Sequence, residues 1–193
     1  AIGCRLPPKK AKEMQVLTQD EIRRFLIQAH EEGYYEFFLL ELTTGMRRGE
    51  ILGLQWKDVN LDTGELHIRR QVVKKGAQTL ISKPKTKSSI RTILLPPGMV
   101  EILAELKKNA TCDWVFPSPV KEGEPRNPDS LYGRFQKILQ RAQCKKVRFH
   151  DLRHTFATMA LENGMDIKTL SAMIGHISAE TTLNIYSHIT DTM

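Results

Sequence analysis

The spacing of apolar residues predicts a mainly helical chain. A Thr18-x-x-Glu21 capping box precedes apolar residues at three- and four-residue intervals, which predicts a helix ending near Gly33. The apolar run at 34–43 predicts a buried helix that ends at Gly45. Helical spacing recurs over 97–108, from Asn127 as N-cap with Pro128 as first helical residue, from His150 to Gly164, over 165–174 and after Ser178.

Between residues 60 and 95 the period changes, and the pattern there predicts strands. A turn at 62–64 is followed by apolar positions at strand spacing, and Gly76 marks a second turn. With the apolar residues at 90–95, these segments predict an antiparallel sheet of about three strands. Residues 112–116 predict one further short buried strand, followed by a loop. The expected fold class is therefore mainly α with a small antiparallel β-sheet, in one domain of ordinary size.

Charge and composition narrow the class of partner. The 193 residues carry a net charge of +7 and a pI near 9.4, which favours a polyanionic partner such as DNA, RNA or an anionic membrane. Cys4, Cys112 and Cys144 lie far apart, which argues against a zinc knuckle or a disulfide framework and fits a reducing cytosol. No apolar run reaches the ~18 residues of a membrane span, and no signal peptide is visible.

The residues with distinctive chemistry lie near the end of the chain. His150 and Arg153 are roughly 60° apart on a helix that turns about 100° per residue. Leu152 and Phe156 lie on another side, so the cation and the imidazole are expected at the edge of a helix whose other face is core. Tyr186 follows on a polar background. A permanent cation, an imidazole and a phenol together suggest chemistry on an anion.

This stretch resembles the catalytic signature of the tyrosine recombinases, the integrases of phages and conjugative transposons. The second box of that family corresponds to His150-x-x-Arg153, then Gly175-His176, then Tyr186 as the nucleophile. The first box, an arginine in a Thr-Gly-Leu-Arg setting, corresponds to Thr44-Gly45-Met46-Arg47. A lysine on a β-turn between the boxes corresponds to Lys85. The similarity extends from about Thr18 to His188.

The resemblance implies the DNA breaking-rejoining fold and a chemistry that needs neither metal nor cofactor. Arg47 and Arg153 would clamp the non-bridging oxygens of a DNA phosphate with their forked guanidinium groups. Lys85 would protonate the leaving 5′ oxygen, His150 would accept the tyrosine proton, and His176 would hydrogen-bond a phosphate oxygen. Tyr186 would form a covalent 3′-phosphotyrosine link, so that strands are rejoined without ATP when a mobile element integrates or is excised.

Two assignments keep alternatives. Arg47 carries over because it directly follows Thr-Gly-Met, but Arg48 is adjacent, and from this piece alone Arg47 also fits a surface arginine paired with Glu50. Lys85 has competitors in Lys83 and Lys87, and a charged loop is usually just solvated. The residues expected to contact DNA outside the catalytic set are Arg48, Lys83, Lys87, Lys145, Lys146 and Arg148.

The basic, proline-containing stretch 1–16 is expected to be a linker arm, either solvated or bound to DNA, before a catalytic domain at 17–193. The chain begins at Ala1, so the family's amino-terminal arm- and core-binding domains are expected to be missing. The full-length protein is expected in the bacterial cytoplasm, as a homotetramer on synapsed double-stranded DNA and without a membrane partner.

Two other functions remain open. The segment 166–188, helix then glycine then helix, is also typical of a non-catalytic helix-turn-helix DNA-binding protein. A type IB topoisomerase shares the chemistry without the need for synapsis. A zinc site is not expected: His150 and His154 have the spacing of zincin ligands, but Asp151 replaces the general-base glutamate and no third ligand is evident.

Overall fold

The structure is a computed structural model that describes residues 15–76, 78–83 and 90–175, together with Glu180, Thr182 and Tyr186. Its helices are α1 (Gln19–Glu31), α2 (Tyr35–Thr44), α3 (Arg48–Leu52), the 3-10 helix η1 (Trp56–Asp58), α4 (Pro97–Lys108), α5 (Pro128–Arg141), α6 (Phe149–Glu162) and α7 (Ile167–Ile174). The strands are β1 (Glu65–Ile68), β2 (Gln71–Lys75), β3 (Gln78–Ser82) and β4 (Arg91–Leu94).

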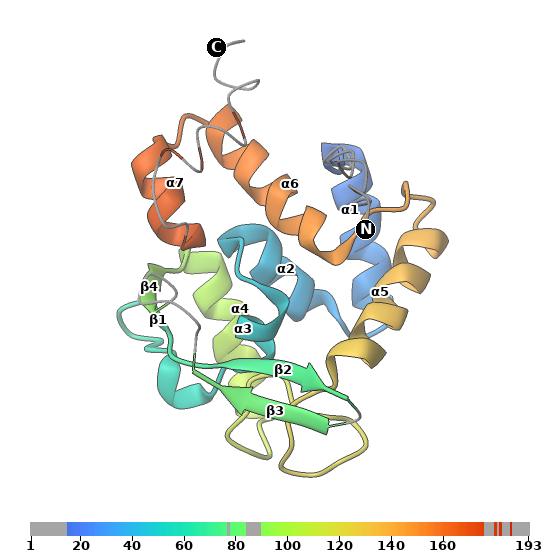
Figure 1. The fold of residues 1–193 in the computed structure, drawn as a ribbon, viewed down its shortest axis with the longest axis vertical. Coiled ribbons are helices and arrows are strands. Elements are labelled where there is room, and N and C mark those ends of the chain that lie inside the picture. The colour runs from blue at the N-terminus through green and yellow to red at the C-terminus, as the bar shows by residue number, and fades with distance from the viewer. Residues whose placement is uncertain are drawn as a thin grey trace, which may run out of the picture.

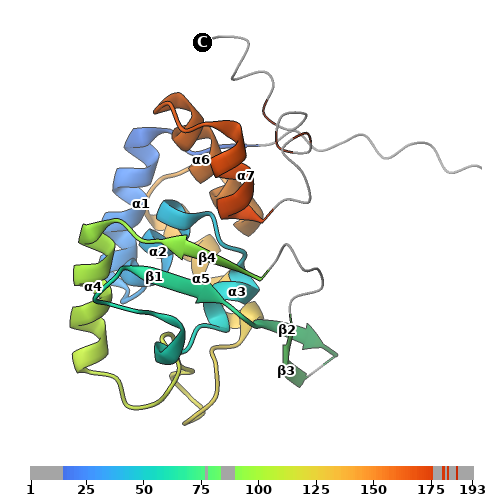
Figure 2. The same cartoon turned by 90° about the vertical axis from the view of Figure 1, so that its left-hand side faces the viewer.

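Figure 1 shows the arrangement of these elements around α2, which lies at the centre of the molecule. Helix α6 runs along one side of α2, and α1 and α5 lie together on another. In the view of Figure 2, the β1–β4 pair lies between α4 and α7, while β2 and β3 project to one side. The mainly helical fold with a small antiparallel component is confirmed.

Local sequence signals explain where the helices begin. Thr18 caps α1 through a complete capping box with Glu21, as predicted. Asn127 caps α5 by accepting hydrogen bonds from Asp129 and Ser130, and Pro128 is the first helical residue. Asp166 caps α7 in the same way, so the helix predicted over 165–174 begins two residues later than expected.

The prediction of a sheet of about three strands was wrong in its detail. Within the described residues four strands form two separate antiparallel pairs, β1 with β4 and β2 with β3. The break between β1 and β2 has a physical cause: Arg70 turns inward, forms an ion pair with Asp58 and donates to the Gly53 carbonyl at 3.3 Å. The apolar residues at 66–73 therefore divide between two strands, β1, which pairs with β4, and β2, which pairs with β3.

The short buried strand predicted at 112–116 was also wrong. Trp114 forms only an isolated bridge with Gln55, although the neighbouring backbone is bonded from Trp56 to Asp113 at 2.9 Å and from Val115 to Leu54 at 3.0 Å. The pairing cannot extend because the partner segment enters η1 at Trp56. Trp114, Val115 and Phe116 are buried, as predicted, but as irregular chain, whereas Asp113 is exposed.

Aromatic side chains form the core between α1, α2, α5 and α6. Phe25 lies 4.9 Å from Phe38 and 5.8 Å from Phe135, centroid to centroid, and Phe135 lies 5.1 Å from Phe149. Edge-to-face packing of this kind adds to the stabilisation that burial provides. This cluster fixes the start of α6 against α2, and so sets the distance between the two sequence boxes. No helix in the described part of the chain is long and apolar enough to span a membrane.

Candidate active site

The two sequence boxes meet at Gly45. This residue ends α2 with φ of 60°, in the left-handed region that favours glycine. A Cβ atom there would clash with the ring of Phe156 on α6 and lie 3.0 Å from Ile174 on α7. Without a side chain at this position, α6 approaches closely enough for Arg153 to donate from Nη1 to the Gly45 carbonyl at 2.8 Å.

Arg47 lies just beyond this glycine, as the N-cap of α3. Its Nη1 donates to Oε1 of Glu50 at 2.8 Å, and its backbone N–H donates to Oε2 of the same residue at 2.9 Å. Its Nη2 donates to the Gly175 carbonyl at 3.1 Å. The pairing with Glu50 that the spacing indicated is present. It is more than a surface ion pair, because Glu50 is only 2% exposed while Arg47 is 36% exposed.

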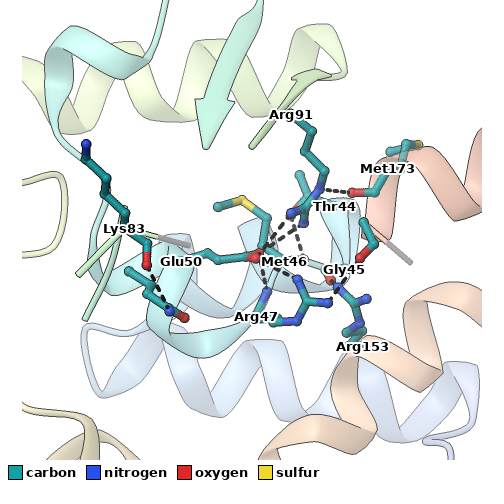
Figure 3. A network of polar contacts seen from close by, with 11 residues as sticks. Thr44, Gly45, Met46, Arg47, Glu50, Lys83, Arg91, Arg153 and Met173 are labelled. Atoms are coloured by element: carbon teal, nitrogen blue, oxygen red, sulfur yellow. Dashed lines mark hydrogen bonds and ion pairs between the residues drawn. The ribbon is translucent and has the colours of Figure 1, made fainter. Parts of the chain in front are cut away.

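Arg91, which was not among the predicted residues, completes this cluster. Its Nη1 and Nη2 contact the two oxygens of Glu50 at 3.2 and 3.0 Å, and its Nε donates to the Met173 carbonyl at 2.5 Å. Figure 3 shows the guanidinium groups of Arg47 and Arg91 converging on Glu50. Together the two arginines satisfy carbonyls at the C-terminal end of α7, which the helix itself leaves unpaired.

The charge of Glu50 is maintained by these contacts. Burial by itself would raise the pKa of this carboxyl group, but the hydrogen bonds and positive charges of Arg91 and Arg47 lower it below its ordinary value. Glu50 is therefore a buried carboxylate that orients two guanidinium groups toward the same region, and it leaves the remaining donors of Arg47 accessible.

Arg153 lies deeper than the sequence predicted. The helical wheel placed it at the edge of a helix, but it is 2% exposed, and nearly the whole circumference of α6 is buried. The reason is that α7 and the first box pack against the side of α6 that was expected to face solvent. Burial, followed by the nearby charge of Arg47, lowers the pKa of Arg153 to about 9.

Glu41 on α2 is a carboxyl group close enough to interact with the charge of Arg153. It is fully buried and interacts electrostatically with Arg48 and Arg153, but burial raises its pKa well above the ordinary value. Within the described residues Arg153 forms no ion pair. Among the described residues, the Gly45 carbonyl accepts a hydrogen bond from this guanidinium, and Glu50 offsets part of its charge from a greater distance.

Tyr186 lies close to Arg153 and packs against α6. It is 1% exposed, and its hydroxyl is 2.6 Å from Nδ1 of His154. Burial raises the pKa of Tyr186 to about 12, although the charge of Arg153 opposes the shift. The hydroxyl of Tyr186 is thus hydrogen-bonded to His154. The residue expected to accept its proton, from the family resemblance, was His150.

His150 and His154 form an edge-to-face pair one turn apart on α6, with ring centroids 4.8 Å apart. His150 is exposed, and the protein and charges around it still lower its pKa to about 4, through desolvation first and then through His154, Arg153 and Arg47. Desolvation likewise lowers the pKa of His154. Both rings are therefore neutral at pH 7.

The structure thus brings together Arg47, His150, Arg153 and Tyr186 of the predicted catalytic set. Lys85 and His176, together with Lys87 of the predicted DNA contacts, lie outside the described residues. Lys83 is described, and Figure 3 shows it apart from the arginines with its side chain pointing away from them. Lys83 therefore lies outside this cluster in the structure, and the choice of Lys85 over Lys83 and Lys87 stays a prediction.

The other predicted DNA contacts differ in their surroundings. Arg48 donates to the Pro128 carbonyl at 3.1 Å, and its guanidinium lies 5.5 Å from the centre of the Phe149 ring, so it holds α3 against α5 and α6. Lys145 forms an ion pair with Glu21, and Arg148 forms one with Asp151 at the start of α6. Lys145, Lys146 and Arg148 are exposed, whereas Arg48 is only half-buried.

Three residues that contact the predicted site residues, or each other, were not predicted from the sequence to belong to the site: Glu50, Arg91 and His154. One signal was available for His154, because residues four apart on a helix share a face, and this spacing was considered only for zinc. Nothing in the local pattern distinguishes Arg91, which opens a strand far from both boxes. In the described part of the chain no group of three or more His, Cys, Asp or Glu side chains is placed to hold a metal ion.

Comparison with known proteins identifies the family. Residues 15–193 match the sequence model of the phage integrase family, and the chain belongs to that family. A tyrosine recombinase XerC-like protein of Caldanaerobacter subterraneus subsp. tengcongensis is 31% identical over 92% of this chain and 51% of its own length. The ICEBs1 integrase of Bacillus subtilis is 24% identical over 94% of this chain and 52% of its own. The chain thus spans about half the length of these relatives.

Solved structures have the same fold. The Tn1549 transposon integrase in complex with transposon right end DNA superposes with a TM-score of 0.80, at 23% identity, over 93% of this chain and 64% of that one. The XerA recombinase gives a TM-score of 0.70 at 28% identity, over 97% of this chain and 64% of that one. The predicted fold, that of a tyrosine recombinase catalytic domain, is confirmed.

Proposed function

We propose that this chain is the catalytic domain of a site-specific DNA recombinase that cleaves and rejoins strands through a covalent 3′-phosphotyrosine. The observation that carries the proposal is the meeting of the two boxes at Gly45, which brings the forked cations of Arg47 and Arg153 together. Tyr186 lies within electrostatic reach of Arg153. Two guanidinium groups and a phenol in this arrangement suit in-line attack on a phosphodiester.

The proposed role of the cations is to bind the phosphate and stabilise the charge that develops in the transition state. Phosphoryl transfer depends mainly on positioning and on preorganised positive charge. Arg47 keeps part of its guanidinium accessible, and Arg153 has no carboxylate partner in the described residues. A phosphate oxygen would supply the negative charge that Arg153 lacks, and His150 lies on the same helix beside it.

Three further elements of the proposal come from the family resemblance. Lys85 would protonate the departing 5′ oxygen, His176 would hydrogen-bond a phosphate oxygen, and no metal or cofactor would take part. The partner would be double-stranded DNA, with the protein in the cytoplasm and, at full length, in a homotetramer on synapsed duplexes. The Tn1549 integrase and a lambda integrase are both described in complex with DNA, which supports the choice of partner.

The two alternative functions fit these observations less well. A helix-turn-helix module needs neither the cluster of Arg47, Glu50 and Arg91 nor a buried tyrosine beside a second arginine, and family membership favours the enzyme. The second helix of that motif lies outside the described residues. A type IB topoisomerase would share the site, so the two enzymes must be distinguished by what they do with DNA.

Covalent trapping tests the proposal. The substrates are duplexes with a nick near the centre of a randomised segment. When the protein cleaves beside the nick, the short fragment between the two breaks diffuses away. The covalent complex then cannot religate, and it survives denaturation with SDS. We expect wild-type protein to accumulate such complexes, with the protein on the 3′ phosphate and a free 5′ hydroxyl that polynucleotide kinase can label. Absence of any complex, or linkage to a 5′ phosphate, would contradict the proposal.

Tyr186→Phe is the matched variant for this assay. It should bind the captured duplexes as wild-type protein does and form no covalent complex, because the attacking oxygen is removed and little else changes. Tyr132→Phe, on the exposed surface of α5, is the control that should leave trapping unchanged. To separate recombinase from topoisomerase, the same protein is given supercoiled plasmids with and without two copies of the captured sequence. Exchange between the two copies is expected, and relaxation of plasmids that lack the sequence is not.

A further inference from the structure

The tyrosine hydroxyl and a histidine that lies outside the predicted catalytic set are in direct contact. Tyr186 Oη lies 2.6 Å from Nδ1 of His154, a normal length for a hydrogen bond between a hydroxyl and a ring nitrogen. Both groups are buried, His154 at 8% exposure and Tyr186 at 1%. The contact joins α6 to a residue 32 positions further along the chain, so it is a tertiary interaction and not a product of local helix geometry.

The position of His154 on α6 follows from that of Arg153. Adjacent residues are about 100° apart on a helix, so Arg153 reaches the Gly45 carbonyl while His154 points in another direction and reaches the Tyr186 hydroxyl. His150, one turn earlier, packs its ring against that of His154 and is itself exposed. His150 therefore faces the accessible surface, and His154 faces the tyrosine.

We propose that His154 is the residue that orients Tyr186 and accepts the proton of its hydroxyl when the tyrosine attacks DNA. This inference rests on the proposed function. It leaves His150, which lies on the accessible side, to contact the phosphate. The second arginine and the proton acceptor then come from neighbouring positions on one helix, so α6 positions both groups at once.

The protonation state of the ring suits this role. Desolvation, with help from Arg153 and Arg148, lowers the pKa of His154, against the opposing charge of Asp151. The ring is therefore neutral at pH 7, and with its proton on Nε2 it offers the lone pair of Nδ1 to the hydroxyl. The hydroxyl is protonated in the free protein, because burial raises its pKa to about 12, so the tyrosine needs a proton acceptor when it attacks.

The step balances as follows. The O–H bond of Tyr186 breaks and its proton moves to Nδ1 of His154, which becomes an imidazolium. The phenolic oxygen forms a bond to phosphorus, and the bond between phosphorus and the 5′ oxygen breaks. The leaving oxygen takes a proton from a second group, assigned above to Lys85. Rejoining reverses each transfer, and the imidazolium returns its proton to the tyrosine.

Nuclear magnetic resonance tests the contact without DNA. In protein labelled with ¹⁵N at histidine, we expect His154 at pH 7 to be the neutral tautomer with Nδ1 unprotonated. Tyr186→Phe should shift the Nδ1 resonance of His154 by removing its donor and leave the resonances of His30, on α1, in place. A protonated Nδ1, or a His154 spectrum that does not respond to Tyr186→Phe, would overturn the assignment.

Single-turnover cleavage of a trapped duplex tests the chemistry. His154→Asn keeps an acceptor near the position of Nδ1 but cannot take up a proton, whereas His154→Ala removes both. We expect each to slow formation of the covalent complex by about 100-fold or more, as loss of a general base does, with unchanged duplex affinity. Because His154 is buried, His154→Ala should also lower the melting temperature, so the rate is compared at a temperature where both variants are folded. His30→Asn is the matched control, since it makes the same change on an exposed helix.

A duplex with sulfur in place of the bridging 5′ oxygen locates the effect. A thiolate leaves without a proton, so Lys85→Ala should regain activity on it, while the loss in His154→Asn should persist because the nucleophile still needs a base. If the loss in His154→Asn disappears on this duplex, or if His154→Asn cleaves the ordinary duplex at the wild-type rate, the inference is wrong. Cleavage by Tyr186→Phe would instead remove the proposed function itself.

Discussion

Arg47 and Arg153 contribute the same chemical group to one site but lie in opposite surroundings. Arg47 shares the buried carboxylate of Glu50 with Arg91 and remains partly accessible. Arg153 is almost fully buried, donates to a backbone carbonyl, and forms no ion pair with any described residue. In the first cluster two guanidinium groups share one carboxylate before DNA arrives, whereas Arg153 is a cation without such a partner among the described residues, and its burial lowers its pKa to about 9.

This difference indicates a division of tasks. A buried ion pair in good geometry holds its members in place, and removing one member leaves the other uncompensated. A buried cation without a counterion destabilises the free protein and gains most when an anion arrives. The cluster around Glu50 therefore acts as a frame that orients Arg47 and α7, and Arg153 is the group that the phosphate completes. Four experiments test this division of tasks.

The largest effect is expected from Glu50→Gln. It removes the negative charge that Arg47 and Arg91 share, including the charge that pairs with the guanidinium of Arg91, which is only 7% exposed. Loss of one member of a buried pair costs about 3–5 kcal/mol, so urea unfolding should show a reduction of this size in the free energy of unfolding. A loss below about 1 kcal/mol would mean that Glu50 is not the frame.

Arg153→Lys should act on catalysis more than on stability. Lysine keeps the charge but loses the fork, so cleavage should fall by about 10²–10³-fold with little change in duplex affinity. The measurement is the single-turnover rate of covalent complex formation beside a binding titration. Arg141→Lys, on the exposed side of α5, serves as the control. Equal losses in rate and affinity would show a general contact with the DNA backbone instead.

A pH titration of stability distinguishes the two regions further. The folded pKa of Glu50 lies below its ordinary value of 4.5, so its contribution is fully present above pH 4.5 and is lost as the pH falls through the folded pKa. The difference in unfolding free energy between wild-type protein and Glu50→Gln should therefore be constant at neutral pH and shrink below pH 4.5. A difference that stays unchanged at the lowest pH that the fold tolerates would contradict the assignment.

The smallest effect is expected at a surface ion pair. Lys108 and Glu105 lie on α4 with both side chains more than two-thirds exposed. Such pairs contribute about 0.2–0.5 kcal/mol on a helix, so Glu105→Gln should change the free energy of unfolding by less than the error of most measurements. It is also the isosteric control for Glu50→Gln, and a comparable loss in both would remove the distinction between frame and surface.

The sequence allowed the helices and part of the site to be predicted. The caps at Thr18 and Asn127 can be recognised from a few neighbouring residues. The spacing of apolar residues shows which face of a helix is buried. The first box and the His150–Arg153 pair could be recognised because each lies on a short continuous stretch. The spacing of apolar residues did not predict the burial of the polar side of α6. This side is covered by α2, α7 and Tyr186, which are distant in the sequence.

The missed residues share this cause. Arg91 reaches the Met173 carbonyl because β4 runs beside α7. The residues around position 91 give no indication that α7 lies next to them. The division of strands into two pairs depends on the inward turn of Arg70 toward Asp58, which is again a contact between separate segments. His154 could have been chosen over His150 only by knowing which ring faces the tyrosine, and that depends on the rotation of α6 about its axis.

Gly45 has a consequence for how relatives of this protein can vary. The group that excludes a larger residue there is the ring of Phe156, a side chain that can itself be replaced. A methyl group at position 45 should therefore be tolerated best together with a smaller residue at 156, subject to the φ of 60° that still favours glycine or asparagine. Homologous sequences should thus show correlated exchange at these two positions while both arginines stay fixed, and a compensating pair made in the laboratory should recover folding that either single change loses.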